Sequence, residues 1–240
     1  MMTTEWDASG TGKFKCSRPV SRTLTYRHRP LGLPIWQDIA KSVQGRMDLD
    51  LEVRCRSCPE CLKARAAHWR LRMLAEIAKS RRTWFATFTF RPEVHYLATC
   101  SATVGVKGGS PPFGELSPDE QFKARHRVLQ EHFTRYLKRI RKAGYRVRYC
   151  FVAEAHKSGL PHYHALIHEI DNPVPHRVLT SEWTAGFSVI KLVDTSSPKP
   201  AAYVAKYLSK SVLARVRASQ RYGELTNEKT PPSRDSHLVT

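Results

Sequence analysis

Apolar side chains recur every three or four positions in two long segments, at about residues 60–81 and 118–143. This spacing predicts two amphipathic helices. Ser117 precedes the second segment as a candidate N-cap, and Gly144 follows it as a candidate terminator. The two long helices therefore frame the middle of the chain.

Short runs of β-branched and aromatic residues predict strands around these helices. We expect the strands at residues 84–90, 145–154, 162–168 and 187–193. Ser158 and Gly159 lie between the second and third runs and predict a β-hairpin. Two shorter helices are expected at about 175–185 and 200–217, and residues 98–118, which are rich in Gly, Ser and Pro, predict a loop.

The order of these elements predicts an α+β fold, with an antiparallel sheet of the five-stranded type and helices packed on one face. Residues 1–62 are expected to form an irregular N-terminal region that carries a cysteine cluster. Residues 63–217 would form the main domain, and residues 218–240 a polar, disordered tail.

Lys and Arg outnumber Asp and Glu by 40 to 21, which gives a formal net charge of +19 and a pI of about 10.0. This excess favours a polyanionic partner such as nucleic acid. A ribosome-bound protein or plain solvation of the surface would give the same charge. No apolar run is long enough to span a membrane, and the first twelve residues lack the apolar core of a secretory signal.

Cationic side chains concentrate where the second long helix ends and the next strand begins. We expect them to follow the phosphates of a nucleic acid strand, although a solvated helix face would look alike. Trp84 is a candidate for base stacking, whereas Trp183 at a helix end also fits a core position. The cationic residues are Arg135, Lys138, Arg139, Arg141, Lys142, Arg146 and Arg148.

His162 and His164 are two positions apart on a predicted strand, so their side chains point the same way and Tyr163 points to the opposite face. Glu154 ends the preceding strand, across the turn from His162. One carboxylate and two imidazoles suit Mg²⁺ or Mn²⁺ and leave positions open for phosphate oxygens. Surface histidines beside an edge carboxylate would give the same pattern.

Tyr203 and Tyr207 lie four positions apart in the last predicted helix, with Lys206 and Lys210 close by. This spacing places both phenols on one helix face. Two hydroxyls one turn apart suit two successive attacks on phosphodiesters, assisted by the lysines. Tyrosines that only pack against the core are the alternative.

The three motifs stand in the order FATFTF at 85–90, PHYHALIH at 161–168 and YVAKYLSK at 203–210. Together they resemble the replication initiators of the microviruses, small icosahedral single-stranded DNA phages, within the HUH endonuclease superfamily. CRSCPEC at 55–61 and LTSEWTAGFSVI at 179–190 resemble the gokushovirus branch. The resemblance covers about residues 50–215.

The resemblance implies an HUH/RRM-like palm and a rolling-circle mechanism. His162, His164 and Glu154 would hold the divalent cation, and one tyrosine would attack the scissile phosphate to leave a 5′-phosphotyrosine and a free 3′-OH. The second tyrosine would allow the displaced strand to be rejoined. The implied partners are a single-stranded DNA origin, a host DNA polymerase and a host helicase, in the cytoplasm of a bacterial host.

Cys55, Cys58 and Cys61 have the spacing of zinc-binding thiolates, but a structural zinc site needs a fourth ligand. The resemblance favours Cys16 for this position, and His68 is the substitute. An iron–sulfur cluster or free thiols would fit the same cysteines.

The residues also fit three other functions. The chain would be a zinc-stabilised nucleic-acid-binding protein if its histidines and tyrosines were structural. It would be another HUH enzyme, such as a transposase or a conjugative relaxase, if the resemblance held only for the superfamily. It would be a metal-dependent nuclease that uses water if Tyr203 and Tyr207 only packed.

Overall fold

The structure is a computed structural model that describes residues 16–27, 46–104, 111–156, 158–194, 198–210 and 214–224. Within these ranges, the side chains of residues 26, 27, 46, 47, 104, 207 and 210 are outside the description. The chain divides into two compact units, Met1–Ala67 and His68–Thr240. Among the described residues, no helix is both long and apolar enough to cross a membrane.

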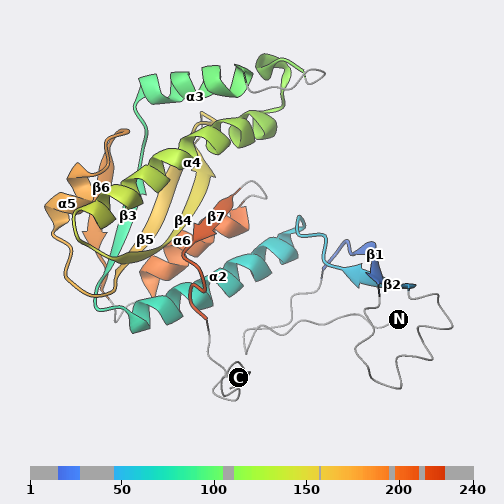
Figure 1. Cartoon of the computed structure of the whole chain (residues 1–240). Helices are drawn as coiled ribbons and strands as arrows, with labels where there is room; N and C mark the ends of the chain where they lie inside the picture. The colour runs from blue at the N-terminus through green and yellow to red at the C-terminus, as the bar shows by residue number, and fades with distance from the viewer. Residues whose placement is uncertain are drawn as a thin grey trace, which may run out of the picture. The chain divides into compact units, whose positions relative to one another are not determined.

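The larger unit contains a five-stranded antiparallel sheet with the order β6-β3-β5-β4-β7 (Figure 1). The strands are β3 (Thr83–Phe88), β4 (Val147–Ala155), β5 (Pro161–Glu169), β6 (Ser188–Leu192) and β7 (Arg215–Ala218). The strands β4 and β5 form the predicted hairpin, in which Glu154 lies opposite His162. The predicted α+β class and antiparallel sheet are confirmed.

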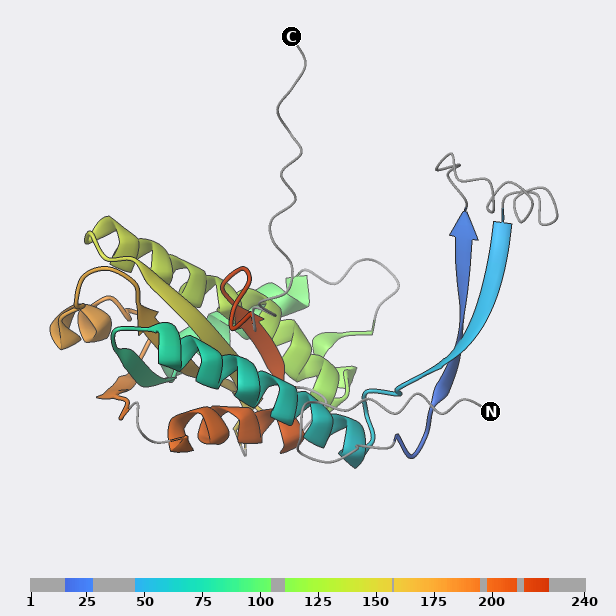
Figure 2. The same ribbon diagram turned by 90° about the horizontal axis from the view of Figure 1, so that it is seen from below.

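Helices cover both faces of this sheet, whereas the sequence predicted one covered face. The helices are α2 (Pro59–Lys79), α3 (Pro92–Val104), α4 (Pro118–Lys142), α5 (His176–Ser181), α6 (Lys199–Lys210) and the short 3₁₀-helix η1 (Phe113–Glu115). Phe133 of α4 packs on Phe151 of β4, with ring centroids 4.4 Å apart. Tyr203 of α6 contacts His164, which pairs with Val152 and so points to the face opposite Phe151. The helices α4 and α6 accordingly lie on opposite sides of the sheet (Figure 2).

Helix α4 begins at the predicted N-cap. The hydroxyl of Ser117 accepts the backbone N–H of Glu120, and the Glu120 carboxylate accepts the backbone N–H of Ser117. This reciprocal pair is a capping box, which satisfies amides that a helix start leaves unbonded. The buried stripe of α4 consists of Phe122, Leu129, Phe133, Tyr136, Leu137 and Ile140.

Part of the predicted loop at residues 98–118 is helical instead, because α3 continues to Val104. Its Ala98 is buried, and the hydroxyls of Thr99 and Thr103 donate to carbonyls four residues earlier. These bonds satisfy polar side chains within the helix, so a composition typical of a loop is compatible with a helix here.

The last predicted helix is shorter than expected, and a strand follows it. The helix α6 ends at Lys210 instead of residue 217, and β7 pairs with β4 along Cys150–Ala153. In β7 the exposed Arg215 and Arg217 alternate with less exposed neighbours. The short strand escapes notice in the sequence because its four residues carry no turn signal and no continuous apolar run.

The disordered tail was expected to begin at residue 218, but residues 219–224 belong to the packed structure. Tyr222 is fully buried, and its hydroxyl forms a 2.7 Å hydrogen bond with Nε2 of His168. The Nε of Arg72 donates to the Tyr222 carbonyl at 2.7 Å. The rest of the predicted tail, residues 225–240, lies outside the described residues.

The smaller unit contains an antiparallel hairpin of β1 (Val20–Arg27) and β2 (Arg46–Val53), where the sequence predicted mostly irregular structure. The hydroxyls of Thr23 and Thr25 donate to the carboxylates of Asp50 and Asp48, each at 2.6 Å. These cross-strand bonds explain how acidic residues, which sheets usually disfavour, are accommodated in a strand.

The bond between Tyr222 and His168 leads to a stability prediction. Burial lowers the pKa of His168 to about 3, so its ring is neutral at pH 7 and needs hydrogen-bond partners. Tyr222→Phe removes one partner and should lower the free energy of unfolding by about 1–3 kcal/mol. Urea denaturation at pH 7 measures this change. Tyr96→Phe, at an exposed tyrosine of α3, should have almost no effect, and equal values for both variants would contradict the prediction.

Candidate active site

Glu154, His162 and His164 lie together on one face of the β4–β5 hairpin. The Nε2 atoms of the two histidines are 3.1 Å apart. The Oε2 of Glu154 lies 3.4 Å from Nε2 of His162 and 3.3 Å from Nε2 of His164. The strand register places Glu154 directly opposite His162, and His164 follows on the same face. The structure thus brings the three residues together as the sequence suggested.

The spacing of these three atoms fits one divalent cation. Ligands at about 2.1 Å in octahedral geometry are separated by about 3.0 Å, and in tetrahedral geometry by about 3.4 Å. The observed separations of 3.1–3.4 Å fall in this range. Since three protein ligands do not fill either coordination sphere, positions would stay open for substrate oxygens.

Two residues of β3 position the ring of His164. The hydroxyl of Thr87 lies 3.2 Å from Nδ1 of His164, and Phe85 stacks on the same ring at a centroid distance of 6.1 Å. Contacts of this kind fix the ring orientation and leave Nε2 directed at the carboxylate. The role of these two residues was not predictable from local sequence patterns, because it depends on the pairing of β3 with β5, which are far apart along the chain.

Tyr203 is the tyrosine that the structure places beside this group. Its ring lies 6.0 Å from the ring of His164 and 5.3 Å from that of Phe85, edge-on to both. The side chain is 46% exposed, so substrate can reach it. The Nζ of Lys206 lies 6.0 Å from the centre of the Tyr203 ring. Tyr207 and Lys210 continue α6, and their side chains lie outside the described part.

The cationic residues predicted to bind DNA begin at the other end of β4 from the candidate active site. The strand β4 runs from Arg148 near its start to Glu154 near its end, so roughly 20 Å separates them. The guanidinium of Arg148 pairs with Glu76, and that of Arg139 donates to the carbonyl of Glu182. These two arginines stabilise the fold. The exposed members of the predicted set are Arg135, Lys138, Arg141, Lys142 and Arg146.

Neither predicted stacking tryptophan is available to a base. Trp84 is 7% exposed, and its indole N–H donates to Glu169 at 2.8 Å. Trp183 is 4% exposed, and its ring lies 4.6 Å from that of Phe88 in the core. The suggestion that Trp84 stacks on nucleic acid is therefore wrong, whereas the core position considered for Trp183 is confirmed.

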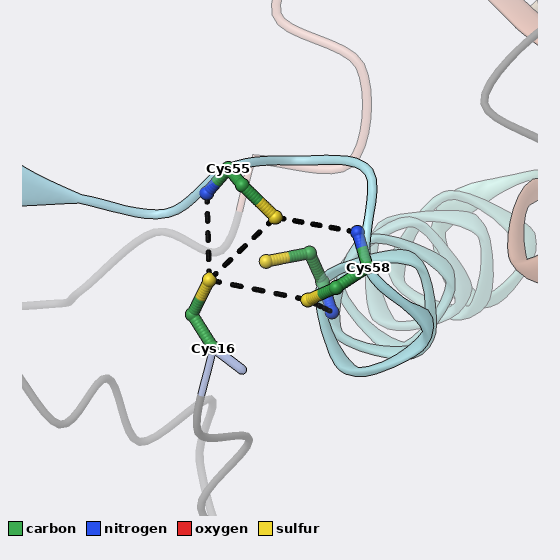
Figure 3. A group of neighbouring side chains, drawn as sticks. Cys16, Cys55 and Cys58 are labelled. Carbon is green, nitrogen blue, oxygen red and sulfur yellow. Dashed lines mark hydrogen bonds between the residues drawn. The ribbon is translucent and has the colours of Figure 1, made fainter. Parts of the chain in front are cut away.

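A second group of metal-ligating residues lies in the smaller unit. The Sγ atoms of Cys16, Cys55, Cys58 and Cys61 all lie within 4.8 Å of one another. The Sγ of Cys16 is 3.7 Å from that of Cys55 and 3.9 Å from that of Cys58 (Figure 3). Thiolates bound to one zinc ion at about 2.3 Å in tetrahedral geometry are separated by about 3.8 Å. The four sulfurs therefore match a single four-coordinate ion.

Backbone amides support the thiolates of this group. The amide N–H of Cys58 donates to Sγ of Cys55 at 3.3 Å, and that of Cys61 donates to Sγ of Cys58 at 3.4 Å. Hydrogen bonds from Ser57 and from the Cys58 amide lower the pKa of Cys55 to about 5. His68, the substitute considered for the fourth ligand, is not in the group.

The contact between Thr87 and His164 yields a second prediction. Thr87→Val keeps the shape of the side chain but removes the bond to Nδ1, so the affinity for Mn²⁺ should fall about 10- to 100-fold. Calorimetric titration of Mn²⁺ measures the affinity. Thr103→Val, on an exposed position of α3, is the matched control. An unchanged affinity in Thr87→Val would show that the ring is held by other contacts.

Comparison with known proteins identifies a family for this chain. The sequence model of the family described as Replication-associated protein ORF2 matches residues 83–212, more than half of the 240-residue chain. This stretch contains the group of Glu154, His162 and His164 as well as Tyr203. Searches of curated proteins and of solved structures found no significant match. The chain belongs to the ORF2 family of replication-associated proteins.

Proposed function

We propose that this chain initiates rolling-circle replication as an HUH-type endonuclease that nicks single-stranded DNA with a tyrosine. The observation that carries the proposal is the position of Tyr203, whose exposed ring stands 6.0 Å from that of His164 in a three-ligand group. The family match to replication-associated proteins and the net charge of +19 support a DNA substrate.

The residues of the group would hold a divalent cation such as Mg²⁺ or Mn²⁺. When bound, this ion would polarise the scissile phosphate as a Lewis acid. Thr87 would accept a hydrogen bond from Nδ1–H of His164, which selects the tautomer whose Nε2 carries the free lone pair. Glu154 and His162 would be the other two ligands of the ion.

Tyr203 would supply the nucleophile. Its phenolic oxygen would lose its proton and form a bond to phosphorus as the bond from phosphorus to the 3′ oxygen breaks, and the 3′ oxygen would take up a proton to become a free 3′-OH. Lys206 stands near enough to the ring to stabilise the negative charge that develops on the phenol. The phosphotyrosine conserves the phosphodiester energy, so attack by a 3′-OH reverses the step and joins the strand.

Tyr207 would act in the second cut. It lies one turn after Tyr203 in α6, and Lys210 bears the same relation to Lys206. A second cleavage at the regenerated origin would leave the 3′-OH that closes the displaced strand. A host polymerase would extend the first 3′-OH, and a host helicase would open the duplex, in the cytoplasm of a bacterium infected by a microvirus-like phage. This setting rests on the resemblance of the motifs.

The covalent intermediate provides the direct test of this proposal. A labelled single-stranded origin oligonucleotide with Mn²⁺ should give an adduct that survives a denaturing SDS gel. The adduct should require metal and disappear in the Tyr203→Phe, Tyr207→Phe double variant and in His162→Ala. Tyr96→Phe, at an exposed tyrosine of α3, should behave as the unchanged chain does.

Three outcomes distinguish the other functions. Cleavage without an adduct would indicate a nuclease that uses water. Binding without cleavage or adduct would indicate a nucleic-acid-binding module without catalysis. An adduct formed on hairpin substrates from mobile elements or conjugative plasmids, but not on phage origins, would indicate another HUH enzyme.

We also propose that Cys16, Cys55, Cys58 and Cys61 hold one structural Zn²⁺. Four protein ligands would fill a tetrahedral sphere and leave no position for substrate. An iron–sulfur cluster fits less well, because it distributes thiolates over several irons, whereas these sulfurs crowd around one point. The ion would join residue 16 to the start of α2 and so close the segment that contains β1 and β2.

Metal content tests the zinc proposal. The purified chain should contain one zinc ion that survives dialysis, and Cys58→Ser should lose it. Cys100→Ser changes an exposed cysteine outside the group and should retain the ion. Loss of zinc from His162→Ala instead of Cys58→Ser would place the ion at the other site, and a zinc-free, stably folded chain would refute the proposal.

A further inference from the structure

The edge strand β6 carries two exposed apolar side chains. Phe187, just before the strand, is 76% exposed, and Val189 is 58% exposed. Among the large apolar side chains of the described ranges, Phe187 has the highest exposed fraction. Such exposure is costly for a phenyl ring in water and is typical of binding surfaces.

Both side chains lie on the sheet face that carries the candidate active site. Val189 pairs with Thr87, and Thr87 pairs with His164 and contacts its ring. Directly opposed residues share a face, so Val189 lies two strand spacings, about 10 Å, from His164. Phe187 is two residues from Val189, and its carbonyl accepts the amide N–H of Thr89, so the ladder continues to it.

The position of Phe187 is fixed by the backbone beside it. A Cβ atom at Gly186 would stand 2.2 Å from the carbonyl oxygen of Thr89, so only glycine allows this approach. The hydroxyl of Thr89 also donates to the Phe187 carbonyl at 3.2 Å. The ring is therefore presented from an anchored main chain, which reduces the entropy lost on binding.

The surroundings of the pair are cationic and open. Lys191 follows on the same face, opposite Phe85, and its side chain is exposed. The helix α6 covers β4 and β5 on this face, and the exposed fractions of Phe187 and Val189 show that their part of β6 is uncovered. An apolar strip beside a cation suits a ligand with flat apolar rings and negative charge.

We infer that Phe187 and Val189 form a platform on which unpaired bases of the DNA strand stack next to the scissile phosphate. The inference rests on the proposed function, because the platform would bind the same DNA strand whose scissile phosphate is held at Glu154, His162 and His164. Aromatic side chains bind single strands in this way with little sequence preference, since every base has a flat face. Lys191 would meet the backbone charge of the same strand.

A protein partner fits the strip less well. A stable protein interface buries about 800 Å² on each partner, and two side chains on an edge strand supply far less. A single base, in contrast, needs one ring to stack on. The distance of about 10 Å from His164 also places the strip within reach of nucleotides that adjoin a phosphate at the metal group.

Binding of a single strand to the full chain tests this inference. The probe is a fluorescently labelled oligothymidine, measured by anisotropy without a chelator so that the proposed ions are retained; it lacks the origin sequence, so the site-specific nick does not occur. Phe187→Ala should weaken binding roughly 5- to 150-fold, and Phe187→Trp should restore it. Binding of a blunt duplex of the same length should be unchanged, because its bases are already stacked.

Leu192→Ala is the matched control. Leu192 is a similarly exposed apolar residue of β6, 54% exposed, but it pairs with Trp84 and so belongs to the opposite face. It should bind the oligothymidine as the unchanged chain does. Equal affinities for Phe187→Ala and the unchanged chain, or equal losses for Phe187→Ala and Leu192→Ala, would overturn the inference.

The same variants separate this inference from the proposed nicking function. If Phe187→Ala binds the single strand as tightly as the unchanged chain while the adduct still forms, the platform is wrong and the nicking function stands. If Phe187→Ala loses binding but no variant or condition gives an adduct, the platform stands as a single-strand binding surface and the nicking function fails.

Discussion

The pairing register of β4 with β5 is the constraint on which the candidate site depends. Glu154 and His162 face each other only in this register, and His164 shares their face only because strand side chains alternate. A slip by one residue would move both histidines to the opposite face. Tyr163 prevents that slip, because it is fully buried and stacks on Phe151, with ring centroids 4.9 Å apart. The aromatic core under α4 therefore holds the ligand geometry on the other side of the sheet.

The histidines at the two ends of β5 have different roles: one is structural, and the other belongs to the candidate active site. His168 shares the face of His164, but it is fully buried, and desolvation lowers its pKa to about 3. Its nitrogens bond Thr83 and Tyr222, so it has no capacity left for a ligand. At the same end, Arg148 pairs with the buried Glu76. The histidine and the arginine at this end are thus paired within the fold, whereas the three residues at the other end form the group suited to a cation.

Local patterns in the sequence predicted the parts of the fold that depend on neighbouring residues. The capping box at Ser117 and the hairpin that brings Glu154 to His162 follow from short-range spacing. Contacts between distant segments were not predictable in this way. Thr87 meets His164 only because β3 pairs with β5, and the burial of Tyr222 depends on its bonds to residues of α2 and β5. The internal pairing of Arg148 with Glu76 was unpredictable for the same reason, because charge alone does not distinguish a phosphate contact from an internal ion pair.

The two groups of metal-ligating residues differ in ligand number, and this difference separates their proposed roles. Four thiols around one point satisfy a tetrahedral ion completely, so such an ion can cross-link the chain but cannot accept a phosphate oxygen. One carboxylate and two imidazoles leave the coordination sphere incomplete, which a Lewis acid requires. The ligand types differ in the same sense, because four thiolates favour zinc, whereas the second group includes a carboxylate, the kind of ligand that suits magnesium and manganese. A site with four protein ligands can stabilise the fold but cannot bind substrate, and a site with three can bind substrate at its open positions. This chain has one group of each kind, in separate units.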